Sequence, residues 1–244
     1  MRDLAVVVPA YNESRLLPGT LAALAVQSDQ DFTLIVVDNA STDDTAAVAA
    51  GFSGEVEVVT EPAPGAGTAA DTGFRHAIRH GATKLLRTDA DCLPAPDWVA
   101  TGRALLDRHD LVCGRSVPRR DENPTWAQRR IYPAVVRLAA RAGRWQHRSA
   151  SARAPFVLVH GHNLAITADL YERCGGTPRE ALEDGAEDVT LLNRARQHSE
   201  RIVRAEELVV ETSLRRLRGW GARRTFLWHW DRRYRPQAEA VHVR

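Results

Sequence analysis

The feature that most constrains the fold is a regular alternation of short apolar runs with helical stretches over the first hundred residues. A continuous apolar run is typical of a parallel strand that is buried on both faces. The four runs are Leu4–Val8, Phe32–Val37, Val56–Val59 and Thr83–Arg87. Between the first two, leucines recur at helical spacing. Alternating strands and helices predict an α/β fold, a Rossmann-like α/β/α sandwich with a mostly parallel central sheet.

Beyond residue 97 the alternation becomes less regular. The expected helices of the whole chain are Ser14–Val26, 44–50, Thr68–His80, Trp98–Arg108, Thr167–Cys174 and 187–198. The further strands expected are Leu111–Cys113, Phe156–Val159, Ile202–Ala205 and Leu208–Glu211. We find no internal repeat and no low-complexity linker. We therefore expect one domain over 1–244, with parts at 1–114 and 115–212 and a basic, aromatic tail at 213–244.

Composition argues against several classes of protein. The 244 residues are 44% hydrophobic and 26% charged, which is ordinary for a soluble domain. A net charge of +2 argues against a nucleic-acid partner. The sequence has no apolar run near the ~18 residues of a membrane span, and Leu4–Val8 is too short for a signal peptide. Cys92, Cys113 and Cys174 spell neither a zinc motif nor a disulfide framework, so we expect a cytoplasmic location.

An acidic turn follows the fourth apolar run. Thr88-Asp89-Ala90-Asp91 brings two carboxylates to the C-terminal end of that strand. Neighbouring carboxylates repel each other, and a hard cation such as Mg²⁺ or Mn²⁺ between them relieves the repulsion. Open α/β sheets bind ligands at this end of their strands. A solvated acidic turn has the same sequence pattern, so the interpretation depends on other stretches of the chain.

Four stretches, in their order and spacing, resemble family 2 glycosyltransferases with the GT-A fold. They are Val6-Val7-Val8-Pro9-Ala10-Tyr11-Asn12-Glu13, Val37-Asp38-Asn39-Ala40-Ser41-Thr42-Asp43, Asp89-Ala90-Asp91 and Glu187-Asp188. The resemblance covers residues 4–212. It implies an enzyme of the hexosyltransferase type (EC 2.4) that transfers a sugar from a nucleotide-diphosphate donor to an acceptor hydroxyl with inversion. Residues 1–114 would bind the nucleotide sugar, and residues 115–212 would face the acceptor.

The resemblance places the nucleotide pocket at the ends of the first two strands. It implies donor contacts by Pro9, Ala10, Tyr11, Glu13 and Asp38. Tyr11 could lie flat against the nucleobase, and Asp38 could accept hydrogen bonds from it. Glu13 could hold the ribose or the edge of the base. The structural alternatives are a core tyrosine for Tyr11 and a simple turn carboxylate for Asp38.

The resemblance also divides the acidic turn. Asp91 would bind the metal that bridges the diphosphate, and Asp89 would share that site while facing the ribose and the donor sugar. The ion, Mg²⁺ or Mn²⁺, would act as a Lewis acid on the departing diphosphate. Gly161-His162-Asn163 resembles the glycine-containing loop beside the donor sugar, where glycine permits a close backbone approach. For His162, a surface or supporting position is the alternative.

The last motif supplies the candidate catalytic base. In the family, a carboxylate at the position of Asp188 takes the proton from the acceptor hydroxyl as that oxygen attacks the anomeric carbon. Glu187 is the next candidate, because the acidic run at 183–188 allows an error of one residue. Alternatively, these acids only complement the positive end of a helix dipole.

The sequence departs from the family pattern at three places. Relatives often carry asparagine where Asp71 stands. Many have a metal-touching histidine after the last core strand, where this chain reads Val209-Val210-Glu211-Thr212-Ser213, so another residue or His229 would have to complete the metal shell. The stretch that begins at Arg215 does not match the Gln-x-x-Arg-Trp motif of processive synthases. We therefore expect a single addition rather than polymerisation.

Basic residues concentrate at 115–153 and 215–235. Because all but Lys84 are arginines, we give single arginines little weight. Arginines such as Arg119, Arg120, Arg129 and Arg130 could hold a phosphate-bearing acceptor. The tail 213–235 could contact an anionic membrane at its cytoplasmic face, or its tryptophans could pack on the core. The acceptor, whether a small molecule, a glycan or a lipid-linked compound, stays unidentified.

Three other functions share part of the pattern. Gly65-x-Gly67-x-x-Ala70 matches a loose dinucleotide-binding pattern, but that pattern belongs after the first strand. A nucleotidyltransferase can share the fold, but a glycine-rich basic loop usually follows its first strand, unlike Pro9–Glu13. The third alternative is a sugar-nucleotide-binding protein without transferase activity, and the presence of both Asp91 and Asp188 argues against it.

Overall fold

The computed structural model describes residues 2–126, 128, 152–179, 187–215 and 218–219. The described strands form one eight-stranded sheet in the order β3-β2-β1-β4-β7-β6-β8-β5. The strands are β1 (Leu4–Ala10), β2 (Thr33–Asp38), β3 (Val56–Thr60), β4 (Lys84–Thr88), β5 (Cys92–Pro94), β6 (Leu111–Pro118), β7 (Asn163–Thr167) and β8 (Ile202–Thr212). The helices are α1 (Leu17–Ala25), α2 (Thr45–Ala50), α3 (Ala66–Arg79), α4 (Trp98–Leu106), α6 (Ala168–Arg173) and α7 (Glu187–His198).

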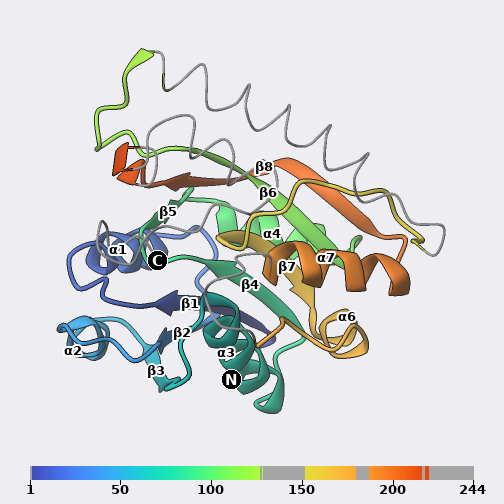
Figure 1. The fold of residues 1–244 in the computed structure, drawn as a ribbon, viewed down its shortest axis with the longest axis horizontal. Coiled ribbons are helices and arrows are strands. Elements are labelled where there is room, and N and C mark those ends of the chain that lie inside the picture. Colours follow the sequence, from blue (N-terminus) through green and yellow to red (C-terminus); the bar gives the residue numbers. More distant parts are fainter. Residues whose placement is uncertain (1, 127, 129–151, 180–186, 216–217, 220–244) are drawn as a thin grey trace.

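The sheet is mixed but mostly parallel (Figure 1). β1 lies between β2 and β4 and is parallel to both, and β2 is parallel to β3. β7 runs antiparallel between β4 and β6. β8 is parallel to β6, and the short β5 pairs antiparallel with β8. This is the predicted α/β class, with β1 and β4 side by side in the interior of the sheet.

The side chains of β1 alternate between two cores, one on each face of the sheet, as the twofold period of a strand requires. Ala5 and Val7 pack in a core to which α3, α6 and α7 contribute. Leu4, Val6 and Val8 pack in a second core, to which α1, α2 and α4 contribute. Helices therefore cover both faces, and the predicted three-layer sandwich is confirmed.

Helix α3 lies unusually close to the central strands. A Cβ atom on Gly73 would clash with Val7 and would lie 2.8 Å from Val37 Cγ2. Glycine at this position therefore allows the helix backbone to rest directly on β1 and β2. This contact fixes the position of α3, whose first turn borders the site described below.

The predicted elements of the first hundred residues are confirmed to within a few residues. One strand prediction is wrong. Residues Phe156–Val159 have no regular structure, although Phe156 and Val159 are buried in the core. Their apolar side chains pack against other elements, while the free edge of β4 is taken by β7, four residues further along.

Two further differences concern the end of the sheet. The two short strands predicted over 202–211 are one strand, β8, whose pairing with β6 shifts register between Cys113 and Arg115. The strand β5 was not expected, because Pro94 lies in it. Among the described strands, β5 stands at the edge of the sheet and pairs with β8 alone, so the missing N–H of Pro94 is tolerated there.

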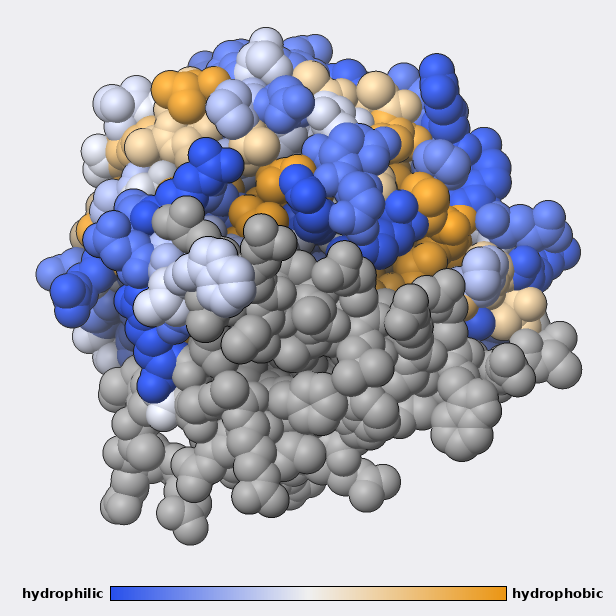
Figure 2. All heavy atoms as spheres, turned by 90° about the horizontal axis from the view of Figure 1, so that it is seen from above, coloured by the Kyte–Doolittle hydropathy of each residue, from blue (hydrophilic) through white to orange (hydrophobic). Residues whose placement is uncertain are grey.

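Among the described residues, no helix combines the length and apolarity that crossing a membrane requires. Figure 2 shows hydrophobic and hydrophilic residues interspersed on the described part of one face. The membrane contact predicted for 213–235 lies mostly outside the described residues, as do Arg129, Arg130 and His229.

Candidate active site

The predicted site residues meet at the carboxyl-terminal edge of the sheet, which is formed by the ends of the parallel strands β1, β2 and β4 and not by an edge strand. In the β1–β2 register Ala10 lies opposite Asp38, so Tyr11 and Glu13 follow β1 on the side where β2 also ends. Asp89 and Asp91 follow β4 at the same edge. Because β7 runs the other way, with Asn163 opposite Thr88, the loop at Gly161 also reaches this edge.

The loops after β1 and β2 are tied to each other by side-chain hydrogen bonds. The Asn12 N–H donates to Ser41 Oγ at 3.0 Å, and Asn12 Oδ1 accepts from the Thr42 N–H at 2.8 Å. The Glu13 N–H donates to Thr45 Oγ1 at 2.8 Å. Asn12 has a φ of 52°, a conformation that asparagine tolerates better than most residues. The two predicted nucleotide-binding loops are thus joined directly to each other.

Asp38 ends β2 with a buried carboxylate that is not fully satisfied. The side chain is 7% exposed, and its Oδ1 has no hydrogen-bond partner within the described part of the chain. An unsatisfied buried acceptor costs free energy, so this oxygen suits a ligand that donates a hydrogen bond. Of the alternatives for Asp38, this observation favours a binding residue over a solvated turn carboxylate.

Asn39, next to Asp38, holds the loop from Glu61 to Gly65 in place by hydrogen bonds. Its Nδ2 donates to the carbonyl oxygens of Glu61 at 2.9 Å and Ala63 at 2.7 Å, and its Oδ1 accepts from the Gly65 N–H at 2.8 Å. Gly65 has a φ of 143°, which a side chain would disfavour, and α3 begins at the next residue. One amide side chain therefore fixes the turn that leads into α3.

Pro9 and Ala10 are buried in β1, whereas Tyr11 is half-buried after it. Asn163 is fully buried, and its amide is used by the fold: Oδ1 accepts from Trp98 Nε1, and Nδ2 donates to the carbonyls of Arg115 and Leu208. The half-buried His162 lies 2.6 Å from Ser116 Oγ through its Nε2. Contacts of these five residues with a donor stay predictions.

The two carboxylates of the acidic turn are paired with different arginines. Arg87 donates to Asp89 Oδ1 from Nε and from Nη2, at 3.3 Å each. Asp91 Oδ2 lies 3.1 Å from Arg215 Nη2. Neither arginine was among the predicted site residues. An arginine at the end of the apolar run Thr83–Arg87 was a usable signal, but the prevalence of arginine in the chain obscured it.

Arg215 also links the acidic turn to Glu13. Its Nη1 donates to Glu13 Oε2 at 2.9 Å, and its Nη2 donates to the other carboxylate oxygen. Glu13 is 6% exposed. Burial raises the pKa of Glu13 to about 6, Arg215 opposes that rise, and the charges of Asp91 and Asp89 add to it. The ends of β1 and β4 therefore share one guanidinium.

The fit of a divalent ion depends on the ligands available at this edge. Within the described residues, no three histidine, cysteine or acidic side chains gather as a metal site. Mg²⁺ typically takes one or two carboxylates and completes its shell with substrate phosphates and water. Asp91, 13% exposed at a strand end, suits such a site, while Asp89 is already paired with Arg87. The residues present fit an ion that is bound together with a diphosphate.

The acids at the start of α7 lie on the other side of Arg87. Arg87 Nη2 is 3.9 Å from Glu187 Oε1. Burial would lower the pKa of Arg87, but the carboxylates of Asp89, Glu187 and Asp188 raise it, so the guanidinium stays charged. Asp188 is 5% exposed and accepts from the N–H groups of Gly161 at 3.3 Å and Val189 at 2.8 Å.

Two glycines allow these close approaches. A Cβ atom on Gly161 would lie 2.9 Å from Arg87 Cζ. A Cβ atom on Gly67, in the first turn of α3, would lie 2.9 Å from Glu187 Cβ and from the Pro178 carbonyl oxygen. The segments before and at the start of α7 therefore both rest on α3.

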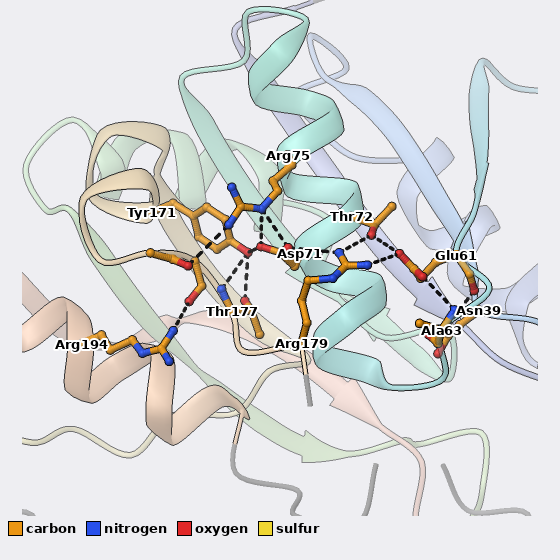
Figure 3. Close-up of polar contacts among 12 residues, drawn as sticks. Asn39, Glu61, Ala63, Asp71, Thr72, Arg75, Tyr171, Thr177, Arg179 and Arg194 are labelled. Carbon is orange, nitrogen blue, oxygen red and sulfur yellow. Dashed lines mark hydrogen bonds and ion pairs between the residues drawn. The ribbon is translucent and has the colours of Figure 1, made fainter. Parts of the chain in front are cut away.

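A hydrogen-bond network around the buried Asp71 fixes the segment that ends at Arg179 to α3 (Figure 3). Asp71 is fully buried and accepts from Arg75 Nε, from the Tyr171 hydroxyl at 2.8 Å and from Arg179 Nη1 at 3.2 Å. Arg179 also donates to Glu61 Oε2 at 2.7 Å. The aspartate that departs from the family pattern is thus the acceptor for two arginines and a tyrosine.

The fold is that of GT-A glycosyltransferases. A mannosyltransferase from Pyrobaculum calidifontis, solved in complex with GDP-Man and Mn²⁺, matches with a TM-score of 0.64 and 24% identity, over 93% of this chain and 61% of that chain. Staphylococcus aureus TarS 1-349, solved in complex with UDP-GlcNAc, matches with a TM-score of 0.61 and 19% identity, over 87% of this chain and 58% of that chain.

The chain belongs to glycosyl transferase family 2, whose domain matches residues 5–173. Uncharacterized glycosyltransferases from Mycobacterium bovis and Mycobacterium tuberculosis are each 40% identical to this chain over 115 residues. That stretch is 46% of this chain and 48% of each relative, so the match spans about half the length of these relatives. The family predicted from the four motifs is confirmed.

Proposed function

We propose that the protein transfers a sugar from a nucleotide-diphosphate donor to an acceptor hydroxyl, with inversion at the anomeric carbon and with the help of a divalent ion. The observation that carries the proposal is the convergence of three carboxylates at one sheet edge, each in different surroundings. Asp38 has an unsatisfied buried oxygen, Asp91 is paired with Arg215, and Asp188 is held by two backbone N–H groups.

The nucleoside would bind at the ends of β1 and β2. The free oxygen of Asp38 would accept a hydrogen bond from the base, and Tyr11 would lie beside the ring. Glu13 would contact the ribose. The named donors of the structural neighbours, GDP-Man and UDP-GlcNAc, carry different bases and sugars. They support a nucleotide sugar as the donor class, and the particular base and sugar are left open.

Asp91 would hold Mg²⁺ or Mn²⁺ together with oxygens of the donor diphosphate, and Asp89 would face the donor sugar. The bound ion would neutralise negative charge on the departing nucleoside diphosphate. The presence of Mn²⁺ in the Pyrobaculum calidifontis mannosyltransferase structure supports this choice of ion.

Asp188 would act as the general base. The acceptor hydroxyl would give its proton to the Asp188 carboxylate while its oxygen bonds to the anomeric carbon, and the bond to the diphosphate would break on the opposite face. The N–H groups of Gly161 and Val189 orient this carboxylate. Glu187 lies within ion-pair distance of Arg87, so it is better placed to hold that cation than to take a proton. A single displacement of this kind would invert the configuration at the anomeric carbon.

A matched pair of variants tests the proposal. In the wild-type protein, UDP or GDP sugars with Mn²⁺ should raise the melting temperature, and a donor-hydrolysis or transfer assay should show turnover. Asp188→Asn should keep the thermal shift and lose turnover. Asp169→Asn, at an exposed ion pair on α6, is the control and should behave as wild type.

The outcomes separate the competing functions. Donor binding without turnover in the wild type would favour a sugar-nucleotide-binding protein. Release of diphosphate from a nucleoside triphosphate and a sugar phosphate would favour a nucleotidyltransferase. Turnover that survives Asp188→Asn would move the base to Glu187. Single addition, a cytoplasmic location and peripheral membrane contact through 213–235 stay part of the proposal.

A further inference from the structure

Arg215 places one guanidinium between two strand ends that are far apart in the sequence. It follows β8, whereas Glu13 follows β1 and Asp91 follows β4. The guanidinium meets both oxygens of the Glu13 carboxylate, and its Nη2 lies 3.1 Å from Asp91 Oδ2. The arginine side chain is 26% exposed, while those of Glu13 and Asp91 are 6% and 13% exposed. These pairs are therefore formed largely out of solvent.

The other arginines at this edge have different partners. Arg87 pairs with Asp89 and Glu187. Arg119 contacts the Asp91 backbone carbonyl, and its ion pairs are with acids near it in the sequence. In the part of the chain that the structure describes, the ion pair of the Asp91 carboxylate is with Arg215. Burial would lower the pKa of Arg215, but Asp91 and Glu13 raise it, so this cation is permanent.

We propose that Arg215 binds the diphosphate of the donor, and that it is the counter-cation of Asp91 until the donor and its divalent ion arrive. This inference rests on the proposed function, since the diphosphate is the ligand that it assigns to Arg215. A guanidinium presents N–H groups that match phosphate oxygens. It also stands two residues beyond Val209-Val210-Glu211-Thr212-Ser213, the stretch where a metal-touching histidine was expected from the family pattern. Arg215 and the ion would thus share the Asp91 carboxylate.

This sharing has two consequences of opposite sign. Removing the guanidinium takes away the cation that pairs with Glu13 and Asp91, so a nucleoside diphosphate should bind more weakly. The same change releases the Asp91 carboxylate, so a divalent ion alone should bind more tightly. If Arg215 only supported the fold, its removal would weaken both the binding of the nucleotide and the binding of the ion.

Isothermal titration calorimetry on the full chain tests both consequences. UDP and GDP are titrated in EDTA and in Mn²⁺, and Mn²⁺ is titrated alone. In EDTA, Arg215→Gln should lose about tenfold or more of the affinity for whichever nucleotide the wild type binds. Added Mn²⁺ should restore most of that loss. Mn²⁺ alone should bind Arg215→Gln severalfold more tightly than it binds the wild type.

Two further variants complete the design. Arg218→Gln removes an arginine from the same segment, 46% exposed and paired with Glu122 at 3.5 Å, and should match the wild type. Arg215→Lys keeps the charge but loses the planar guanidinium with its several N–H donors. Its nucleotide affinity in EDTA should lie between those of the wild type and Arg215→Gln. If Arg215→Gln does not fold, the same titrations of Arg215→Lys decide the matter.

The possible failures are distinguishable. Equal nucleotide affinity of wild type and Arg215→Gln in EDTA would overturn the role of Arg215 and leave the proposed function standing. Weaker Mn²⁺ binding by Arg215→Gln would do the same. If the wild type binds neither nucleotide, with or without Mn²⁺, the proposed donor class is wrong and the role of Arg215 falls with it.

Discussion

The guanidinium of Arg179 is ion-paired with the carboxylate of Glu61 at 2.7 Å, although 118 positions separate the two residues (Figure 3). The Glu61 N–H donates to the Asp38 carbonyl at 2.9 Å, so the pair is attached to the proposed nucleobase site. Arg179 also stands at the end of the described segment that precedes α7, which carries Asp188. The ion pair therefore joins the proposed donor pocket to the segment that leads to the proposed base.

We expect Arg179→Gln to lower kcat by about tenfold while the donor dissociation constant changes little, because the base would be less well placed over an intact donor pocket. Steady-state kinetics and nucleotide titration together measure this split. Arg173→Gln removes an exposed ion pair with Asp169 and serves as the control. A uniform loss of donor affinity and kcat, or no loss at all, would contradict the positioning role.

Glu61 should contribute to stability in a pH-dependent way. Burial would raise the pKa of Glu61, but hydrogen bonds from Thr72, the Ala63 N–H and Arg179 lower it below its ordinary value of 4.5. A lowered folded-state pKa means that this stabilisation is present above pH 4.5 and is lost as the pH falls through the folded-state pKa. Thermal melts from pH 7 to pH 3 should therefore show a shallower acid decline for Glu61→Gln than for the wild type. If the melting temperatures of wild type and Glu61→Gln fell in parallel as the pH is lowered, Glu61 would not be a source of the pH-dependent stability.

Asp71→Asn replaces a fully buried carboxylate by an amide and should destabilise this chain. The amide would present donors to Arg75, Arg179 and Tyr171, which now donate to the carboxylate. Loss of these charge-assisted hydrogen bonds should cost about 1–3 kcal/mol in the free energy of unfolding, measured by urea denaturation. The two arginines are about half exposed, which limits the loss. A stability equal to wild type would show that the charge of Asp71 is not needed.

Gly161→Ala should impair transfer, because the new methyl group would lie 2.9 Å from Arg87 Cζ. Arg87 is buried and cannot move aside freely, so the Gly161 N–H that holds Asp188 would shift. We expect a loss of kcat of about tenfold or more with folding retained. Gly19→Ala in α1, whose new methyl group would be 3.6 Å from its nearest neighbour, is the matched control. Full activity of Gly161→Ala would contradict the tight packing at this loop.

Much of the fold was predictable from the sequence, because buried parallel strands leave continuous apolar runs such as Leu4–Val8. The failure at Phe156–Val159 has a physical cause. Apolar residues show that a segment is buried, but which segment pairs with the edge of β4 depends on tertiary contacts. For the same reason, β5 was missed, since an edge position makes Pro94 acceptable.

The candidate site was predictable where motifs follow strand ends, as at Asp38 and Asp91. The ion pairs within it were not. Glu13 and Arg215 are 202 positions apart, and local spacing cannot reveal such a contact. The position of Arg87 at the end of a strand could be predicted from the sequence. Its burial between Asp89 and Glu187 could not, because Glu187 is far away in the sequence.

Helix α3 supports both flanks of residues 180–186: Arg179 through Asp71 and Thr72, and Glu187 through its contact with Gly67. The two ends of this stretch are therefore positioned by one helix, whose first turn also borders the proposed donor pocket. A displacement of α3 would thus move the turn at Gly65 and the start of α7, which carries Asp188, together.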